Sequence, residues 1–367
     1  MKTIKNNTYA LILVLAVVTT IFWSCENPID FDGEQMTPLI VMNSLISPDS
    51  TFKVQLSKSK FFLKDNDTFD PINNANVKLF VNDTLYETLA FSESGNYNAS
   101  YVPKVGDNVK LTAEYSNMST VSAVTAIVKP AQISSIDTST ITTDTYPILS
   151  YQYGGYYGEV TGTDTIGYSQ NKKLNIRINI NDDVNLKNYY RVSLRIKRYF
   201  DDGRETDNEY YYESDDMVFG SSNESGLFGE GYSRSIYNEF SDDLFNGKNY
   251  PFKLSAYFNT YTYNTEKKPD EQGGVEWPEV VRSELIVQVH SISESYYKYV
   301  KTVNTNSNAL AFFSEPVQIY SNVKGGIGVF GNYKIDNYII QIPVSYTDNY
   351  PTFSPKLQTK SSTSPQP

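Results

Sequence analysis

The sequence predicts a mainly β protein, in which an N-terminal immunoglobulin-like β-sandwich is followed by a larger β-rich domain with one short helix. The 367 residues include 31 Tyr and 19 Phe, and aromatic residues are enriched in strands. Apolar and polar residues alternate in short runs such as Asn76–Val81 and Tyr189–Arg198, which is the period of a strand with one buried face. Asn, Asp, Gly, Pro and Ser separate the runs, as is typical of turns.

The first 24 residues are predicted to be a lipoprotein signal peptide. Lys2 and Lys5 precede the apolar run Ala10–Trp23, which is the arrangement of an export signal. As a helix, this run would cover roughly 21 Å, short of the roughly 30 Å hydrocarbon core of a bilayer. Ser24 and Cys25 follow directly, and Cys25 is the single cysteine, so it has no disulfide partner in the chain. We therefore expect cleavage before Cys25 and its lipidation; the alternative is an ordinary cleaved signal with a chance cysteine.

Residues 25–36 are predicted to be an acidic tether between the lipid and the folded part. The segment Glu26–Gln35 combines acidic residues with Pro28 and Gly33, a composition that favours a solvated linker. Acidic residues directly after a lipidated cysteine also resemble the signal that sends some bacterial lipoproteins to the cell surface. The expected location is therefore the outer membrane, lipid-anchored and at the cell surface, with the periplasmic face left open as the alternative.

Residues 37–130 are predicted to form the immunoglobulin-like sandwich. Strand-like runs recur here about every dozen residues, each bounded by turn residues, which is the pattern of such a sandwich. The runs are Leu39–Leu45, Thr51–Leu56, Val77–Val81, Thr84–Phe91, Asn96–Val102, Asn108–Tyr115 and Ser119–Val128. Lys129 and Pro130 mark the predicted boundary to the next domain.

Residues 131–348 are predicted to form the larger β-rich domain. Its strand-like runs are Asn175–Ile180, Tyr189–Arg198, Phe252–Phe258, Glu284–Ser291, Val317–Tyr320 and Tyr338–Val344. Two polar stretches, Tyr146–Asn171 and Asp201–Tyr237, exceed normal loop lengths and are expected to be long functional insertions. Ser291 and Glu294 have the spacing of a capping box, which predicts a helix near 291–304. The tail, 349–367, is predicted to be disordered from its composition.

Two groups of tyrosines are the candidate binding residues. Tyrosine is rigid and amphipathic and is enriched in recognition surfaces, although tyrosines on the face of a strand are an equal alternative. Both groups fall in the predicted insertions of the second domain, where recognition residues tend to concentrate. The candidates are Tyr151, Tyr153, Tyr156 and Tyr157 in a glycine-rich stretch, and Tyr210, Tyr211 and Tyr212 in a second stretch.

The glycine motif and the single histidine give little support to an enzyme. Gly326, Gly328 and Gly331 match G-x-G-x-x-G, but a strand-like run follows them where a nucleotide site needs a helix. A tight, crowded turn is the better interpretation. His290 is the only histidine, and no Gly-x-Ser-x-Gly motif accompanies it, so we interpret it as a residue just before the helix cap.

Acidic clusters are the remaining chemical candidates. Pairs such as Asp182–Asp183 and Asp242–Asp243 have the residue type that a glycosidase or a Ca²⁺ site would use, but solvated turns are the favoured interpretation. The sequence therefore predicts no catalytic residue, no metal ligand and no cofactor. A formal net charge of −11 disfavours nucleic acid as a partner, because nucleic-acid binding needs a basic surface.

Several segments along the chain together carry a family resemblance. They begin at Cys25-Glu26 and Pro38–Ile46 and continue through Asn188-Tyr189-Tyr190 and Phe240–Lys248. The strongest segment is Ser314–Val323, which runs into Gly325–Gly331. In these segments the chain resembles an uncharacterised, domain-of-unknown-function family of Bacteroidota outer-membrane lipoproteins. Members are often encoded beside TonB-dependent receptors, so the resemblance implies an outer-membrane β-barrel receptor as a partner and transfers no catalytic residue.

The expected function is a non-enzymatic surface lipoprotein that assists an outer-membrane receptor or binds its substrate, with a glycan or a peptide as the ligand class. One alternative is a secreted hydrolase that uses carboxylates, such as a glycosidase. Another alternative is a structural or adhesive component of the envelope.

Overall fold

The computed structural model describes residues 37–60, 68–154, 159–219, 238–263, 280–306, 318–344 and 357–358. The predicted signal peptide, Cys25 and the acidic tether lie outside the described residues, as do Tyr156 and Tyr157. The described residues from Leu39 onward belong to one compact unit. The prediction of a mainly β protein with one short helix is confirmed.

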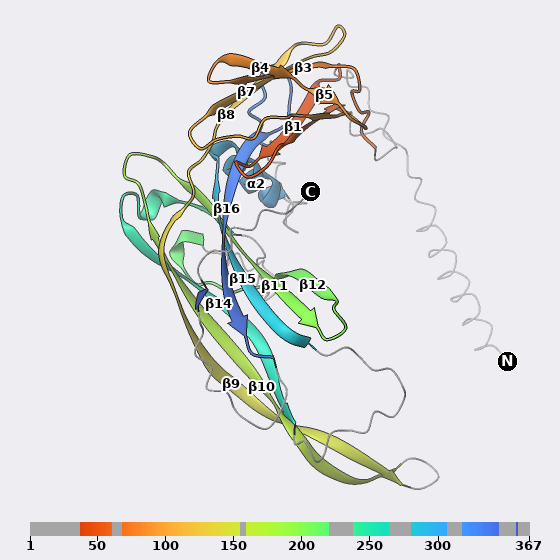
Figure 1. The fold of residues 1–367 in the computed structure, drawn as a ribbon, viewed down its shortest axis with the longest axis vertical. Helices are drawn as coiled ribbons and strands as arrows, with labels where there is room; N and C mark the ends of the chain where they lie inside the picture. Colours follow the sequence, from red (N-terminus) through yellow and green to blue (C-terminus); the bar gives the residue numbers. More distant parts are fainter. Residues whose placement is uncertain are drawn as a thin grey trace, which may run out of the picture. The chain divides into compact units, whose positions relative to one another are not determined.

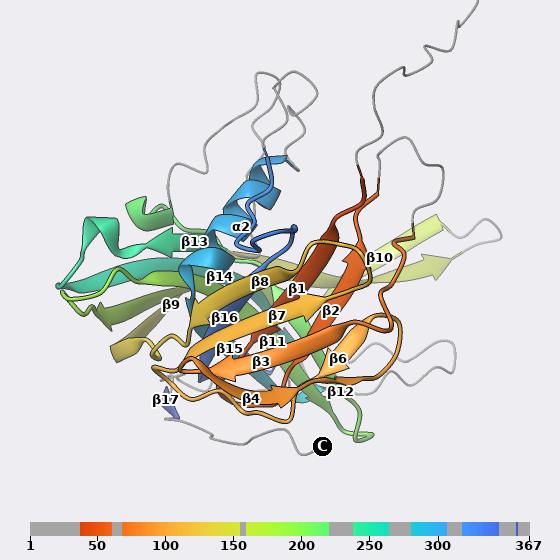
Figure 2. The same cartoon turned by 90° about the horizontal axis from the view of Figure 1, so that it is seen from above.

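The first sandwich consists of two layers of short strands. One layer contains β1 (Ile40–Ile46), β2 (Lys53–Lys58), β6 (Asn96–Asn98) and β5 (Ala90–Phe91), and the other has the order β4 (Thr84–Thr88), β3 (Asn76–Val81), β7 (Asn108–Glu114) and β8 (Val121–Ala126). Figure 2 shows the second layer lying over β1, β2 and β6. The alternate residues of each strand point inward, as the sequence pattern predicts, and meet in one apolar core. Fully buried members of this core are Met42, Val54, Leu56, Val77, Leu79, Val109 and Leu111.

The layer that contains β1 continues into a second, larger sheet. The strand order is β12-β11-β15-β16-β1-β2-β6-β5, because β1 pairs in parallel with β16 (Phe330–Ile342), with Ser44 opposite Phe330 and Ile46 opposite Asn332. The chain leaves the first sandwich after β8 and enters β9 (Gln132–Gly154) close to the predicted boundary at Pro130. Its last long strand nevertheless returns to the first sandwich.

A glycine-rich turn makes this return possible. At Gly328, φ is +124° and a Cβ atom would lie 2.1 Å from the carbonyl oxygen of Met42; at Gly326 it would lie 2.3 Å from that of Ile40. The backbone runs so close to β1 that Met42 N–H donates to the Ile327 carbonyl at 2.9 Å. The interpretation of these glycines as a crowded turn is therefore confirmed.

The residues just before this turn do not form the predicted strand. Of the expected run Val317–Tyr320, Val317 lies outside the described residues, and Gln318 to Tyr320 have no regular secondary structure. Shortly after this segment, the Asn322 side chain accepts from the Phe330 N–H at 2.9 Å and donates to the Phe330 carbonyl at 2.8 Å. These two hydrogen bonds hold the residues before the glycine turn against the first residue of β16.

The second part of the chain also has two layers. The sheet β9-β10-β14, made by β9, β10 (Glu159–Asn181) and β14 (Asn249–Tyr263), packs against β11 (Tyr189–Phe200), β15 (Val280–Ile292) and β16. Further elements lie at the margins: β12 (Glu205–Tyr210), β13 (Asn238–Ser241) and the 3-10 turns η1 (Met217–Phe219) and η2 (Asp242–Leu244). The core between the layers includes Ile176, Ile178, Val192, Leu194, Phe252, Leu254, Val287 and Val289.

The prediction of a loop over Tyr146–Asn171 is wrong. The described residues of this range, 146–154 and 159–171, continue β9 and β10 as a long pair of strands that extends beyond the ends of β11 and β15 (Figure 1). Side chains on both faces of this part are exposed, among them Tyr146, Tyr151 and Tyr168. A strand without a covered face needs no apolar–polar alternation, so the sequence here looks like a polar insertion. Four register shifts along the β9–β10 ladder weaken the pattern further.

The helix α2 (Glu294–Asn306) starts three residues later than the capping-box prediction. Ser291 lies in β15, and the capping residue is Ser293, whose Oγ accepts from the Tyr296 N–H at 3.3 Å. The helix packs on β11 through the Tyr189–Tyr297 ring pair, with centroids 4.7 Å apart. Among the residues that the structure describes, no helix has both the length and the apolar character needed to cross a bilayer.

The C-terminal tail differs from the prediction at two residues. Leu357 and Gln358 form β17, which pairs with Ile340 and Ile339 of β16. The other residues of 349–367 lie outside the described ranges.

Candidate binding site

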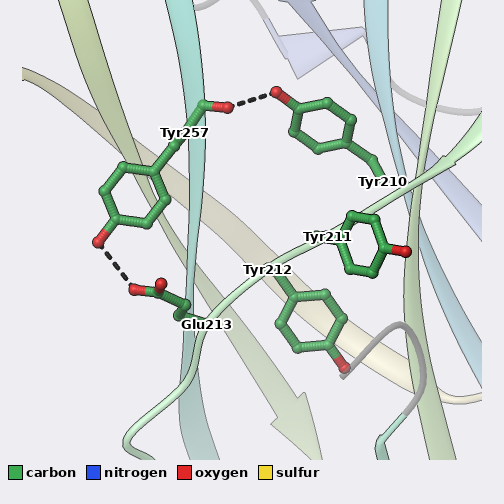
Figure 3. A pocket seen from close by; sticks show the side chains of 5 residues that line it. All are labelled: Tyr210, Tyr211, Tyr212, Glu213 and Tyr257. Carbon is green, nitrogen blue, oxygen red and sulfur yellow. Dashed lines mark hydrogen bonds between the residues drawn. The ribbon is translucent and has the colours of Figure 1, made fainter. Parts of the chain in front are cut away.

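An aromatic pocket lies beside the outer edge of β14, which is the edge that faces away from β10. It has a volume of about 180 Å³ and is lined by Tyr210, Tyr211, Tyr212, Glu213 and Tyr257 (Figure 3). The chain leaves β12 at Tyr210 and runs along β14, where Glu213 and Ser255 exchange two backbone hydrogen bonds of 2.8 Å. This antiparallel bridge places the Glu213 side chain on the face of the sheet that carries Ser255 and Tyr257.

Hydrogen bonds hold the pocket's polar groups in place. The Tyr257 hydroxyl donates to Glu213 Oε2 at 2.9 Å, and the Tyr210 hydroxyl donates to the Tyr257 carbonyl (Figure 3). Burial raises the pKa of Tyr210, which keeps its hydroxyl protonated as a donor. On β10, Lys173 places its Nζ 5.6 Å from the centre of the Tyr257 ring. The site thus offers a fixed carboxylate beside an aromatic ring that is 42% exposed.

The three consecutive tyrosines of this group have different roles. Tyr211 is 51% exposed and Tyr210 is partly buried, so both are accessible at the pocket. Tyr212 is only 2% exposed, and its hydroxyl donates to the Val192 carbonyl at 3.0 Å. Tyr212 therefore lines the pocket from the core side, with little exposed surface, and its role as a binding residue stays a prediction.

The second predicted tyrosine group lies elsewhere. Tyr151 is exposed near the far end of β9, and Tyr153 belongs to the same strand. The ladder places Ile141 of β9 in line with Lys173 and Tyr257. Tyr151 is ten residues further along β9, or roughly 30 Å at the rise of a strand. The structure therefore does not bring Tyr151 to the pocket.

Tyr257 is a member of the pocket that the sequence analysis did not single out, and Glu213 belongs to an acidic cluster with Asp215 and Asp216, which falls under the interpretation of the acidic clusters as solvated turns. Both are next to features that it did identify, namely the tyrosine triplet and the run Phe252–Phe258. The missing information was the pairing of Glu213 with Ser255, which joins positions 42 residues apart in sequence. Only tertiary structure supplies that pairing.

His290 lies within β15, and not immediately before the helix as predicted. Its Nε2 is 3.1 Å from Ser193 Oγ, a distance that a serine–histidine pair in an enzyme would also have. The Ser193 residue is only 2% exposed, so a substrate has no route to its hydroxyl. Burial, aided by the Arg191 charge, lowers the pKa of His290 to about 4. We therefore assign this pair to the fold.

In the acidic pairs Asp182–Asp183 and Asp242–Asp243, the first residue of each pair accepts hydrogen bonds that stabilise the fold. Asp182 accepts hydrogen bonds from the Tyr190 hydroxyl at 2.9 Å and the Gly247 N–H at 2.9 Å. Asp242 is fully buried, its Oδ2 accepts from the Asn188 N–H at 2.6 Å, and burial raises its pKa. The interpretation as solvated turns is therefore wrong for Asp242. Within the described ranges, no group of three His, Cys, Asp or Glu side chains has the geometry to hold a metal ion.

The segment 240–248 also belongs to the core. Phe240 and Phe245 are each 1% exposed and pack around the Tyr190 ring. This segment of the family resemblance therefore stabilises the core of the second part of the chain.

The fold and the pocket together define a two-layered β protein with an aromatic surface site. The chain belongs to the family described as Domain of unknown function (DUF4249), whose sequence profile matches residues 26–339. No curated protein matches the chain at a significant level. Among solved structures, a candidate membrane anchored protein from Corynebacterium diphtheriae is similar over 72% of this chain and 56% of that protein, at 11% identity and a TM-score of 0.19. The chain thus covers less than two thirds of that protein, and a TM-score this low supports no further inference.

Proposed function

We propose that this chain is an outer-membrane lipoprotein of the cell surface that binds substrate, without chemistry of its own, as the partner of a TonB-dependent β-barrel receptor. The observation that carries the proposal is the open pocket at the edge of β14. There Tyr211 and Tyr257 expose their rings beside the Glu213 carboxylate. Rigid aromatic side chains contribute contact area at a low entropic cost, which is the property of a recognition surface.

The pocket is attached to a paired strand and to the apolar core, and this also supports a binding role. Its back wall is Tyr212, which packs in the core between the two layers of the second part. Its front is fixed by the bridge between Glu213 and Ser255. Sites on paired strands keep their geometry better than sites on unpaired loops, so a ligand would meet a preformed surface.

The receptor partnership predicts co-purification. If the full-length chain with a C-terminal affinity tag is solubilised from its own membranes in a mild detergent, we expect an outer-membrane β-barrel protein in the eluate. A matched eluate from a tagged lipoprotein of another family controls for nonspecific capture. Mass spectrometry identifies the bands. Recovery of the lipoprotein alone, under conditions where known barrel complexes stay intact, contradicts the partnership.

The lipid anchor predicts a second result. Replacing Cys25 by serine removes the thiol that the acyl chains need, so the protein should lose its membrane attachment or keep its signal peptide. Several acyl chains give stable anchoring, since each buried CH₂ contributes about 0.8 kcal/mol. Fractionation and the intact mass of the product measure this, with Ser24→Ala as the control that keeps the cysteine. A Cys25→Ser protein that is processed and membrane-bound like the parent excludes the lipoprotein assignment.

A further inference from the structure

The outer face of the sheet β9-β10-β14 extends the pocket into a larger aromatic surface. This face points away from the core, since the alternate residues Leu174, Ile176 and Ile178 of β10 point inward. The ladder places Ile141, Lys173 and Tyr257 side by side in one row across the three strands. It places Tyr146, Ser169 and Tyr261 side by side in another row on the same face.

The rings on this face are exposed. Tyr146 is 54% exposed and Tyr261 is 41% exposed, close to the value for Tyr257. Tyr261 lies four positions after Tyr257 on β14, which corresponds to about 13 Å along a strand. Tyr146 lies two strands away from Tyr261 across the sheet, which corresponds to about 10 Å. Three tyrosines therefore stand on one face at intervals comparable with the length of two sugar rings.

Polar groups without a formal charge fill most of the space between the rings. The row between the two aromatic rows contains Asn171 and Asn259, with Asp144 beside Asn171 as its one charged member, and Asn175 and Ser255 follow beyond Tyr257. An asparagine amide offers hydrogen-bond donors and an acceptor, and a serine hydroxyl can also donate and accept a hydrogen bond. Sugar hydroxyls need partners of this kind, while the C–H face of a pyranose packs against an aromatic ring. The Glu213 carboxylate at the end of the surface adds a strong acceptor for hydroxyl groups.

Charge and backbone geometry argue against the other ligand classes. A net charge of −11 and the Glu213 carboxylate disfavour an anionic ligand, and the one lysine of the two aromatic rows, Lys173, is directed over the Tyr257 ring. A peptide that added a strand would need a free edge. At the pocket, the edge of β14 is taken at Ser255 by Glu213.

We propose that this face, together with the pocket, binds a linear, neutral, 1,4-linked oligosaccharide, with the Tyr257 and Tyr261 rings as its platforms. The inference rests on the proposed function, because it names the ligand that the lipoprotein would present to its receptor. Glu213 orients the Tyr257 ring through the hydroxyl and also lies within reach of the sugar.

Calorimetric titration of the full lipidated chain tests the proposal, in a detergent whose headgroup is not a sugar. The probes are hexaoses of α-1,4-glucose, β-1,4-glucose and β-1,4-mannose, with hexagalacturonate as the anionic comparison. We expect at least one neutral hexaose to bind. Tyr257→Ala and Tyr261→Ala should each weaken its affinity about tenfold or more, as for a central aromatic contact.

Tyr168→Ala is the matched control, because Tyr168 is an exposed tyrosine of the same sheet next to Ser169 and so lies on the opposite face. It should leave the affinity unchanged. The proposal is overturned if no neutral hexaose binds at millimolar concentration, if hexagalacturonate binds more tightly, or if Tyr257→Ala and Tyr261→Ala bind like the parent. In each of these cases the co-purification result is unaffected, so the receptor partnership stands or falls on its own test.

Discussion

Replacing Gly328 by alanine should prevent the chain from reaching a stable fold. The new Cβ would lie 2.1 Å from the Met42 carbonyl oxygen and 2.8 Å from its carbon, and φ of +124° is itself unfavourable for alanine. Both of these Met42 atoms belong to the backbone, and the position of a Cβ is fixed by its own backbone, so no side-chain rotation relieves the clash. We expect a loss of about 4 kcal/mol or more, in the range of the most damaging single substitutions. Soluble yield and the thermal midpoint by circular dichroism measure the effect.

Gly203→Ala is the control for backbone strain alone. Gly203 also has a positive φ, +83°, but a Cβ there would meet nothing within 4 Å. Its substitution should cost about 1–2 kcal/mol, the usual penalty for an L-residue in the left-handed region. If the two variants melt at the same temperature, the close approach of the turn to β1 adds nothing to the loss of stability. Our account of how β16 joins the first sandwich then fails.

The first sandwich was predictable because its strands bury one face. Val77 and Leu79 point inward while Asn76 and Lys78 point outward, so the period of two is visible in the sequence. The long pair of strands β9 and β10 was predicted as a loop because its distal half exposes both faces and leaves no such period. The alternation of apolar and polar residues therefore depends on whether another layer covers one face of the strand, and a strand with two exposed faces does not show it.

The candidate site was predictable only in part. Tyr210 and Tyr211 were identified by their residue type, and the structure places them at a pocket. Tyr212 was identified on the same ground and is buried, because successive residues of an extended chain point in opposite directions. Applying that alternation to the triplet would have separated Tyr211 from Tyr212. The partnership with Tyr257 depends on a long-range bridge that no local pattern contains.

The parallel pairing of β1 with β16 was not predictable for a similar reason. It joins Ser44 to Phe330 across most of the chain, and each strand taken alone fits a simple sandwich. The glycine turn gave an indirect signal, since its crowding implied that another backbone lay close. The identity of that backbone came only from the structure.

The side chain of Asn332 is the polar connection at this junction. It lies in β16 with no exposed surface. Its Nδ2 donates to Thr125 Oγ1 and to the Ala126 carbonyl, each at 2.7 Å, and its Oδ1 accepts from the Val128 N–H at 2.8 Å. The end of β8 is thus held to β16 by three hydrogen bonds from one amide.

Asn332→Ala should therefore destabilise the protein by about 3–5 kcal/mol. The substitution removes three hydrogen bonds, of which the one to Thr125 is buried and those to Ala126 and Val128 are partly buried, and each such loss costs about 1–3 kcal/mol. Urea denaturation followed by circular dichroism gives the change in the free energy of unfolding. Asn337→Ala is the matched control on the same strand, since Asn337 is exposed and its amide oxygen accepts one bond, from Gln288 Nε2. That control should cost less than about 1 kcal/mol. Equal losses for the two variants would mean that the end of β8 is held by its apolar contacts alone, and that the amide of Asn332 does not couple the first sandwich to the larger sheet.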